Sequence, residues 1–330
     1  MKINRKYLII GTLALVVVAA IVVGLLLGKN NKEDGPQVIG VFMSDGRTEQ
    51  EKTLVAQIAD QLERNNFAVK VYDANGDQAT QNQQFAEFLE GKCHGALLCP
   101  VMPDSTANLV QQAKENHVPL VFIEKEPAQE ILDMWDRVAY VGCNAAEVGK
   151  LQGQLILGQA QKSDINGDGI ISYVVLRDSQ DSTATSRRVQ GAVDTMKESI
   201  AVSLLNDASS GDDRAAAKET LGKLLANYGK DIEVVICAND TIALGAMDAV
   251  LDGGRTVGKD IYLIGADGSA KALEQIKAGQ ISGTVLCDFR NQAQKMAALL
   301  QELLIQPAAQ KQSYVNHATV TKENAEEFLK

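Results

Sequence analysis

Acidic and amide side chains alternate between Asp164 and Asp168 in a pattern that suits a hard divalent cation. Asp164, Asn166 and Asp168 occupy positions 1, 3 and 5 of an EF-hand-like loop, and the glycine after Asp168 allows its sharp turn. The carbonyl of Ile170 and the hydroxyl of Ser172 then fall at positions 7 and 9. Position 12 is a valine, so a Ca²⁺ site needs a carboxylate from elsewhere in the chain. The spacing leaves open an Asx-rich turn without metal.

Two further polar side chains follow apolar runs of strand length. Asn239 comes shortly after Glu233–Cys237, and Asp267 comes shortly after Ile261–Gly265. A carboxamide can donate to one hydroxyl and accept from another, and a carboxylate accepts stronger hydrogen bonds than a neutral group does. Both side chains therefore suit a hydroxylated ligand. The alternative for each is a helix N-cap, for which Asp240 is the better candidate beside Asn239.

The elements that position these side chains follow from the hydropathy pattern. Beyond residue 37, strand-length runs that are apolar throughout alternate with amphipathic helical stretches, which is typical of parallel sheets covered on both faces. The alternation is repeated in a second half, so the sequence predicts two doubly wound α/β lobes. Ligands of such sheets bind beyond the carboxyl ends of the strands. The predicted strands are 38–43, 67–72, 95–99, 119–123, 172–176, 202–205, 233–237, 261–265 and 283–287.

Composition and motifs exclude several classes of function. The chain carries 32 basic and 42 acidic residues, a net charge of −10, which excludes binding to a phosphate backbone. No Gly-rich phosphate loop and no nucleophile elbow occurs. The three His lie apart, and no pair of acids is marked by its spacing. We therefore expect a binding protein and not an enzyme.

The cysteines lie mostly near the ends of predicted strands. The five residues of this type form no CxxC pair, which excludes zinc-finger and redox motifs of that kind. A soft-metal or thiol-reactive pocket is one interpretation of the grouping, whereas a free cysteine usually behaves as a small buried hydrophobe. Spacing alone assigns no disulfide. The four cysteines at or near strand ends are Cys99, Cys143, Cys237 and Cys287.

The N-terminal segment predicts the compartment. Tyr7–Gly28 contains no charged side chain, and as a helix it would be about 33 Å long, enough to cross a hydrocarbon core of about 30 Å. Lys2, Arg5 and Lys6 precede it and favour a cytoplasmic N-terminus with an exported body. We expect residues 1–34 to form a transmembrane anchor and tether; a cleaved signal peptide is the alternative.

Several stretches, in order along almost the whole chain beyond residue 37, resemble the galactose/glucose-binding branch of the type I periplasmic binding proteins of ABC transport. The resemblance implies two lobes, joined by three crossovers, that close on a ligand. The matching stretches are Ile39-Gly40-Val41, Val118–Phe122 with Lys125-Glu126-Pro127, Tyr140–Gly142, Asp164–Gly169, Glu233–Ile236, Asn239-Asp240 and Gly283–Leu286.

The resemblance also implies the boundaries of the lobes. Residues 35–143 with 288–316 would form the N-terminal lobe, and residues 144–287 with 317–330 the C-terminal lobe. In the family, the carboxylate that completes the calcium loop opens the strand matched here by Glu233–Ile236. Glu233 is therefore the expected bidentate ligand of a structural Ca²⁺.

The same resemblance implies a set of ligand contacts. Asn239 and Asp267 match family residues that bind sugar hydroxyls. Arg188 matches an arginine that binds the ring oxygen, and a slip of one residue would select the arginine before it. Lys125 matches a sugar-contacting lysine, while Glu124 replaces an asparagine and can accept hydroxyls, pair with Lys125 or bind a cationic group.

Other family contacts are replaced. In place of the family's aromatic-Asp-Asp run after the first strand, this chain has Ser44-Asp45-Gly46-Arg47. The family's stacking Trp corresponds to a position at or beside Asp212, and the sole Trp of this chain is Trp135. Sugars prefer an aromatic floor, so we expect weak binding of galactose and glucose and better binding of a pentose or another small polar ligand. The predicted function is capture of such a ligand, foremost a monosaccharide, by an exported, membrane-anchored solute-binding protein that serves an ABC importer. The alternative is a ligand-sensing co-receptor for a membrane histidine kinase or another signalling partner.

Overall fold

The N-terminal lobe is built on one parallel sheet. The structure is a computed structural model that describes residues 35–46, 49–158, 163–178, 183–211 and 213–329. The strands of this lobe are β1 (Val38–Met43), β2 (Ala68–Asp73), β3 (Gly95–Leu98), β4 (Leu120–Ile123), β5 (Val138–Gly142) and β11 (Gln312–Tyr314). They lie in the order β11-β5-β4-β3-β1-β2, and every pairing is parallel.

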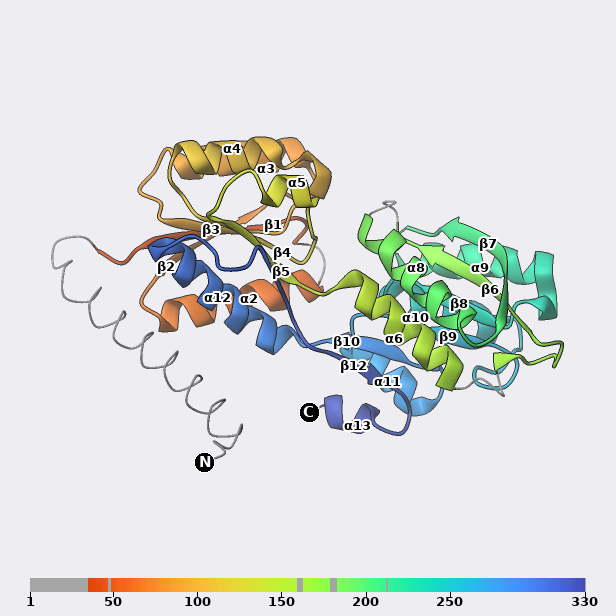
Figure 1. The fold of residues 1–330 in the computed structure, drawn as a ribbon. Coiled ribbons are helices and arrows are strands. Elements are labelled where there is room, and N and C mark those ends of the chain that lie inside the picture. Colours follow the sequence, from red (N-terminus) through yellow and green to blue (C-terminus); the bar gives the residue numbers. More distant parts are fainter. Residues whose placement is uncertain (1–34, 47–48, 159–162, 179–182, 212, 330) are drawn as a thin grey trace, which may run out of the picture.

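Helices cover both faces of this sheet because successive strand residues point to opposite sides. Ile39 and Val41 of β1 pack with Leu54 on one side, while Phe42 packs with Phe85 on the other. The first side is covered by α2 (Glu49–Arg64) and α12 (Phe289–Ile305), and the second by α3 (Gln78–Leu89), α4 (Ala107–Glu115) and α5 (Gln129–Leu132), as Figure 1 shows. A 3₁₀ turn, η1 (Pro103–Ser105), precedes α4.

The C-terminal lobe repeats this design with one difference. Its strands are β6 (Ile170–Arg177), β7 (Ala201–Ser209), β8 (Val234–Cys237), β9 (Tyr262–Ile264), β10 (Thr284–Cys287) and β12 (His317–Val320). The order β7-β6-β8-β9 is parallel, and isolated parallel bridges join Ile264 of β9 to Gly283 and Asp267 to Leu286 of β10. β12 pairs with β10 in the antiparallel sense, so the expectation of wholly parallel sheets is wrong at this strand. The chain enters β12 from the other lobe, beside the carboxyl end of β10, and must therefore run the opposite way.

Helices also cover both faces of the second sheet. On one face lie α6 (Ala145–Gly158) and α8 (Thr183–Lys197). On the other face lie α9 (Arg214–Tyr228), α10 (Asp240–Asp252) and α11 (Ala270–Ala278). The 3₁₀ turn η2 (Gly229–Asp231) follows α9, and α13 (Ala325–Phe328) packs against α11. Gly149 allows α6 and α8 to pack closely, since a Cβ there would lie 1.9 Å from the carbonyl oxygen of Arg188. A larger residue at 149 would push α8, and with it Arg188, away from α6.

Three connections join the lobes. The chain leaves the N-terminal lobe between β5 and α6, returns between β10 and α12, and crosses again between β11 and β12 (Figure 1). The predicted α/β architecture with parallel sheets is confirmed, with the exception at β12. The predicted transmembrane helix falls on residues 1–34, which lie outside the described residues. Within the described ranges, no helix is both long and apolar enough to span a bilayer.

Candidate functional site

The predicted ligand residues lie mainly where strands of the two sheets end. Glu124 and Lys125 directly follow β4 in the N-terminal lobe, whereas Asn239 follows β8 and Asp267 follows β9 in the C-terminal lobe. Arg188 comes from α8. The carboxyl ends of parallel strands meet at one edge of a sheet, so each lobe presents a polar edge, as expected for doubly wound sheets.

A hydrogen-bonded group after β1 and β4 forms part of the edge of the N-terminal lobe. Lys125 Nζ donates to Ser44 Oγ at 3.2 Å, and Ser44 Oγ donates to Glu51 Oε2 at 2.9 Å. The backbone amides of Ser44 and Asp45 also donate to Glu51, which is buried. No local sequence pattern marks Glu51, because its contact with Ser44 forms only when α2 folds back against the end of β1.

Hydrogen bonds hold both the backbone carbonyl and the side chain of Glu124 in place. Its φ of 63° lies in the left-handed region, and its carbonyl accepts a hydrogen bond from Tyr140 at 3.0 Å. The side chain of Gln292 donates to its carboxylate. Burial raises the pKa of Glu124 to about 7; the bond from Gln292 opposes this rise, while the negative charges of Asp267 and Glu51 add to it. The charge of Asp267 in the C-terminal lobe therefore acts on the carboxyl of Glu124 in the N-terminal lobe.

Asn239 and Asp240 have different roles at the start of α10. Asn239 is the N-cap, with its Oδ1 accepting from the amide of Ile242 at 3.0 Å, so the preference for Asp240 as the cap is wrong. Asp240 is only 1% exposed and accepts from Thr284 Oγ1 at 2.7 Å and from the amide of Ser269 at 2.6 Å. The oxygen of Asn239 thus caps the helix.

Asp267 lies between β9 and α11 in a conformation unusual for a residue with a side chain. Its φ is 103°, and its amide donates to the carbonyl of Val285 at 2.8 Å. Ser269 caps α11 through its side chain, so the alternative of Asp267 as that N-cap is wrong. Burial and then the charge of Asp267 raise the pKa of Asp240 to about 7. The charge of Asp267 therefore acts on a second, buried carboxyl, that of Asp240.

The two arginines of α8 point to different places. Arg188 donates to the carbonyl of Ala238, just before Asn239, and its Nε is buried without a hydrogen-bond partner among the described residues. Arg187 instead forms an ion pair with Glu126 of the N-terminal lobe at 3.2 Å. Arg188 thus lies beside the strand end that carries Asn239, whereas Arg187 bridges the lobes. A small cavity beside this bridge is lined by Glu126, Pro127, Ala128, Gln129, Glu130, Thr183, Ala184 and Arg187.

The structure brings Glu233 to the candidate calcium loop. This residue is fully buried, and its Oε1 accepts from the amides of Ile165 at 2.6 Å and Asn166 at 3.0 Å. Its Oε2 accepts from the amide of Ser172 at 2.8 Å. The carboxylate, 61 to 68 residues away in sequence from these amides, therefore closes the loop at both ends.

The loop side chains mostly bind the loop's own backbone. Asp164 accepts from the amides of residues 167, 168 and 169, and Asp168 accepts from the amide of Ile170 at 2.8 Å. Asn166 donates to Asp168 at 3.0 Å. Carboxylate, amide and carbonyl oxygens fit Ca²⁺ in kind. In this structure, however, the carboxylates of Asp164, Asp168 and Glu233 are not among the described groups whose ligand atoms lie within 4.8 Å of one another.

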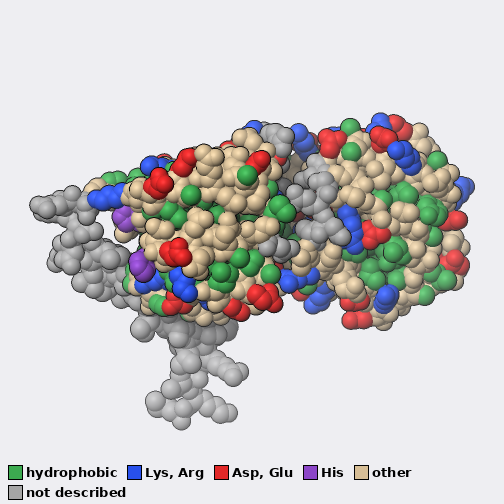
Figure 2. All heavy atoms as spheres, turned by 90° about the horizontal axis from the view of Figure 1, so that it is seen from above, with side chains coloured by type: hydrophobic (Ala, Val, Ile, Leu, Met, Phe, Trp, Pro, Cys, Tyr) green, Lys and Arg blue, Asp and Glu red, His purple; other side chains and the backbone are tan. Residues whose placement is uncertain are grey.

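Trp135 is partly buried and packs against the core between the first sheet and α3–α5. Figure 2 shows acidic and basic side chains interspersed over the face that it presents.

Comparison with known proteins places this architecture in a family. Residues 39–307 match the model of the periplasmic binding protein domain. The D-galactose/methyl-galactoside binding periplasmic protein of Haemophilus influenzae is 29% identical over 236 residues, covering 70% of each chain. The galactofuranose-binding protein of Escherichia coli is 22% identical over 227 residues, covering 68% of this chain and 69% of that protein.

Solved structures agree in fold. An ABC transporter solute binding protein from Bacillus halodurans with bound myo-inositol has a TM-score of 0.77 at 22% identity, and the match covers 91% of this chain and 99% of that chain. The binding protein of the arabinose ABC transporter from Shewanella, bound to L-arabinofuranose, has a TM-score of 0.79 at 18% identity, covering 88% and 94%. These relatives are solute-binding proteins of ABC transporters, not enzymes. The chain belongs to the periplasmic binding protein family, in the type I, sugar-binding group of ABC transport proteins.

Proposed function

We propose that this protein captures a small, hydroxylated ligand, foremost a monosaccharide, in the cleft between its lobes. The observation that carries the proposal is the position of Glu124 after β4 in one lobe and of Asn239 and Asp267 after β8 and β9 in the other. The charge of Asp267 acts on Glu124, and the hydroxyls of a sugar are donors that stabilise two such carboxylates. Arg188 and Asn239 add donors from the C-terminal lobe.

The names of the relatives support this ligand class. They are described as binding galactose, galactofuranose, ribose and allose, and solved structures of the same fold contain arabinofuranose and myo-inositol. The altered contacts after β1 and the position of Trp135 in the core favour a pentose or another small polyol over galactose and glucose.

We further propose that residues 1–34 anchor the protein in the membrane, with the two lobes on the extracytoplasmic side. The apolar run Tyr7–Gly28 and the preceding basic residues support this placement. The partner is then the permease of an ABC importer, as the transport relatives suggest. A retained anchor and an altered pocket support the second candidate, a co-receptor for a sensor kinase; crosslinking in membranes, followed by mass spectrometry, separates the two partners.

Ca²⁺ in the loop of Asp164, Asn166 and Asp168 is also part of the proposal. The donor set, the buried carboxylate of Glu233 and the carbonyl of Ile170 support it. The ion would stiffen the connection between α6 and β6 and would have no catalytic role.

The test of the main proposal is calorimetry on the full-length protein in mild detergent. The panel contains D-galactose, D-glucose, D-ribose, L-arabinose and myo-inositol. We expect at least one pentose or polyol to bind with a Kd below 1 mM, that is with more than about 4 kcal/mol of binding free energy, and more tightly than galactose or glucose. If none of the panel binds below 1 mM, the cleft is not a monosaccharide site.

A further inference from the structure

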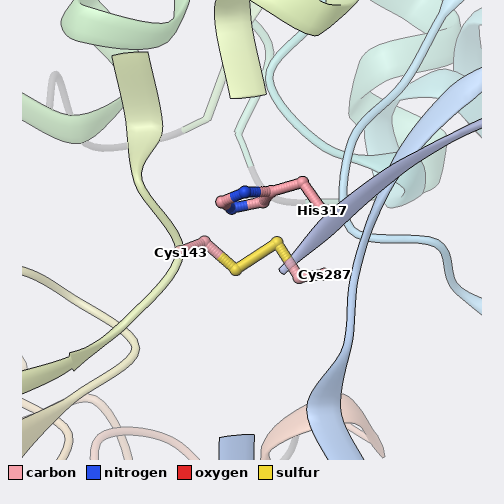
Figure 3. Close-up of side chains that lie close together, drawn as sticks. All are labelled: Cys143, Cys287 and His317. Carbon is pink, nitrogen blue, oxygen red and sulfur yellow. A yellow bond between two sulfur atoms is a disulfide. The ribbon is translucent and has the colours of Figure 1, made fainter. Parts of the chain in front are cut away.

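Two of the three inter-lobe connections are joined covalently. Cys143 directly follows β5 at the first connection, and Cys287 ends β10 at the second. Their side chains form a disulfide, with the Cα atoms 6.4 Å apart and a sequence separation of 144 (Figure 3). Ligand capture by two lobes requires bending at these connections. The disulfide therefore lies at the hinge, where Cys287 is buried in the hydrophobic core and Cys143 packs against it.

The third connection contributes an imidazole at the same place. His317 is the first residue of β12 and is paired with Cys287 in the antiparallel register. One of its ring nitrogens and the two sulfur atoms lie within 4.8 Å of one another. Figure 3 shows the ring lying beside the disulfide, and the three side chains come from three different connections.

His317 is in a state that suits coordination. Its Nε2 is buried and has no hydrogen-bond partner among the described residues. An imidazole nitrogen without a hydrogen-bond partner can donate its lone pair to a metal.

We propose that Cys143, Cys287 and His317 form a zinc site at the hinge. The two sulfur atoms either bind the metal as thiolates or form the disulfide with each other. Thiolate and imidazole are the ligands that Zn²⁺ prefers, and two sulfurs with one nitrogen leave a fourth position for water. Two thiolates on one tetrahedral Zn²⁺ lie about 3.8 Å apart. The zinc joins all three connections, whereas the disulfide joins two.

A dithiol reductant converts the disulfide form into the form that binds zinc. The dithiol gives two electrons and two protons to the disulfide, which yields the thiols of Cys143 and Cys287 and the oxidised dithiol. Zn²⁺ then replaces the two thiol protons, which pass to the solvent, and His317 binds through a ring nitrogen that carries no proton. In an oxidising compartment without reductant, the disulfide form prevails.

The test is zinc titration of the full-length protein against a chromophoric chelator, without oxygen, after reduction with a dithiol and its removal. We expect one equivalent of Zn²⁺ to bind with a submicromolar Kd, and Co²⁺ in its place to show thiolate-to-metal charge-transfer absorption. The oxidised wild type should bind at least 100-fold more weakly, a comparison that needs no substitution. His317→Asn should weaken binding at least tenfold.

Matched variants control for other thiols and imidazoles. Cys93→Ser removes the partly exposed free thiol, and His117→Asn replaces an exposed histidine at a left-handed position that asparagine tolerates. Both should bind zinc as the wild type does. Equal zinc binding by the oxidised and reduced wild type overturns the proposal, as does undiminished binding by a folded His317→Asn variant. Should that variant fail to fold, absence of the cobalt–thiolate band in the reduced wild type overturns it.

Discussion

Arg187 and Glu126 form an ion pair across the cleft, with Nη1 and Oε2 3.2 Å apart. Arg187 belongs to α8 of the C-terminal lobe, and Glu126 follows β4 in the N-terminal lobe. The side chain of Glu126 is only 7% exposed and also accepts hydrogen bonds from Gln312 and Tyr314, each at 2.7 Å. The pair is therefore a contact that opening of the lobes would break.

Loss of this ion pair should weaken ligand binding. Arg187→Gln removes the charge that Glu126 faces, so closure of the lobes loses about 1 kcal/mol and the Kd rises about fivefold, mainly through faster release. Stopped-flow fluorescence and calorimetry with the best ligand measure this. The matched control is Arg214→Gln, because Arg214 is 48% exposed against 49% for Arg187 and pairs with Asp248 inside one lobe. An equal effect of both variants would show that the bridge has no role in closure.

Asp267 should contribute strongly to ligand binding. Asp267→Asn replaces the charged carboxylate by an amide, whose oxygen is a weaker acceptor and whose NH₂ group can only donate to ligand hydroxyls. The Kd should therefore rise by about one to two powers of ten. Calorimetry measures the affinity, and melting with and without Ca²⁺ checks the fold. Asp231→Asn, at an exposed position after α9, should bind as the wild type does. Unchanged affinity in Asp267→Asn would remove this residue from the site.

The buried carboxyl of Glu124 should make the unliganded protein more stable in mild acid. Its pKa is raised from 4.5 to about 7, so between these values the folded state binds more protons than the unfolded state. Stability therefore falls as the pH rises through this window, by about 1–3 kcal/mol, and stays lower above it. Asp240, raised to about 7, contributes in the same sense.

Glu124→Gln tests this pH dependence directly. The variant has no charge to bury, so it should melt above the wild type at pH 8 and close to it at pH 5. Glu130→Gln, at an exposed position, is the control. Thermal melts across pH 5–8 without ligand make the measurement. A wild type whose melting temperature rises from pH 5 to 8, in parallel with the variant, would contradict the assignment.

Calcium should raise the melting temperature through Glu233. Glu233→Gln keeps the shape of the side chain but removes the charge, so the variant should lose the Ca²⁺-dependent rise whatever its basal stability. Scanning calorimetry in chelator and in millimolar Ca²⁺ measures the difference. Glu219→Gln, at an exposed ion pair in α9, should keep the full response. Identical melting of the wild type in both buffers would leave the loop as a turn without metal.

The N-terminal segment should hold the protein in the membrane. Residues 1–34 lie outside the described residues, and the prediction depends on the apolar run Tyr7–Gly28 alone. The full-length protein should sediment with membranes and resist high salt, because an apolar run of that length inserts nearly irreversibly. Fractionation and N-terminal sequencing make the test. A soluble mature protein that begins after residue 28 would show cleavage instead.

Strand positions and strand ends could be predicted because they depend on local hydropathy. Val234–Cys237 is apolar throughout and is the fully buried strand β8, with Asn239 directly beyond it. β12 was missed because His317–Val320 is short and mixed in character, and its antiparallel pairing depends on where the chain returns from the other lobe. Glu51 was missed for a similar reason, since its partner Ser44 meets it only through the packing of α2.

The sequence by itself determined the acidic charge, the apolar N-terminal run, the alternation of strands and helices, and the family, because each is a property of composition or of short, ordered motifs. Only the tertiary structure decided that Arg187 and not Arg188 bridges the lobes, since both lie on α8 and packing sets which one faces Glu126. It also decided that Cys143 meets Cys287. No local pattern links residues so far apart, because their distance is set by how three separate connections pass between two folded lobes.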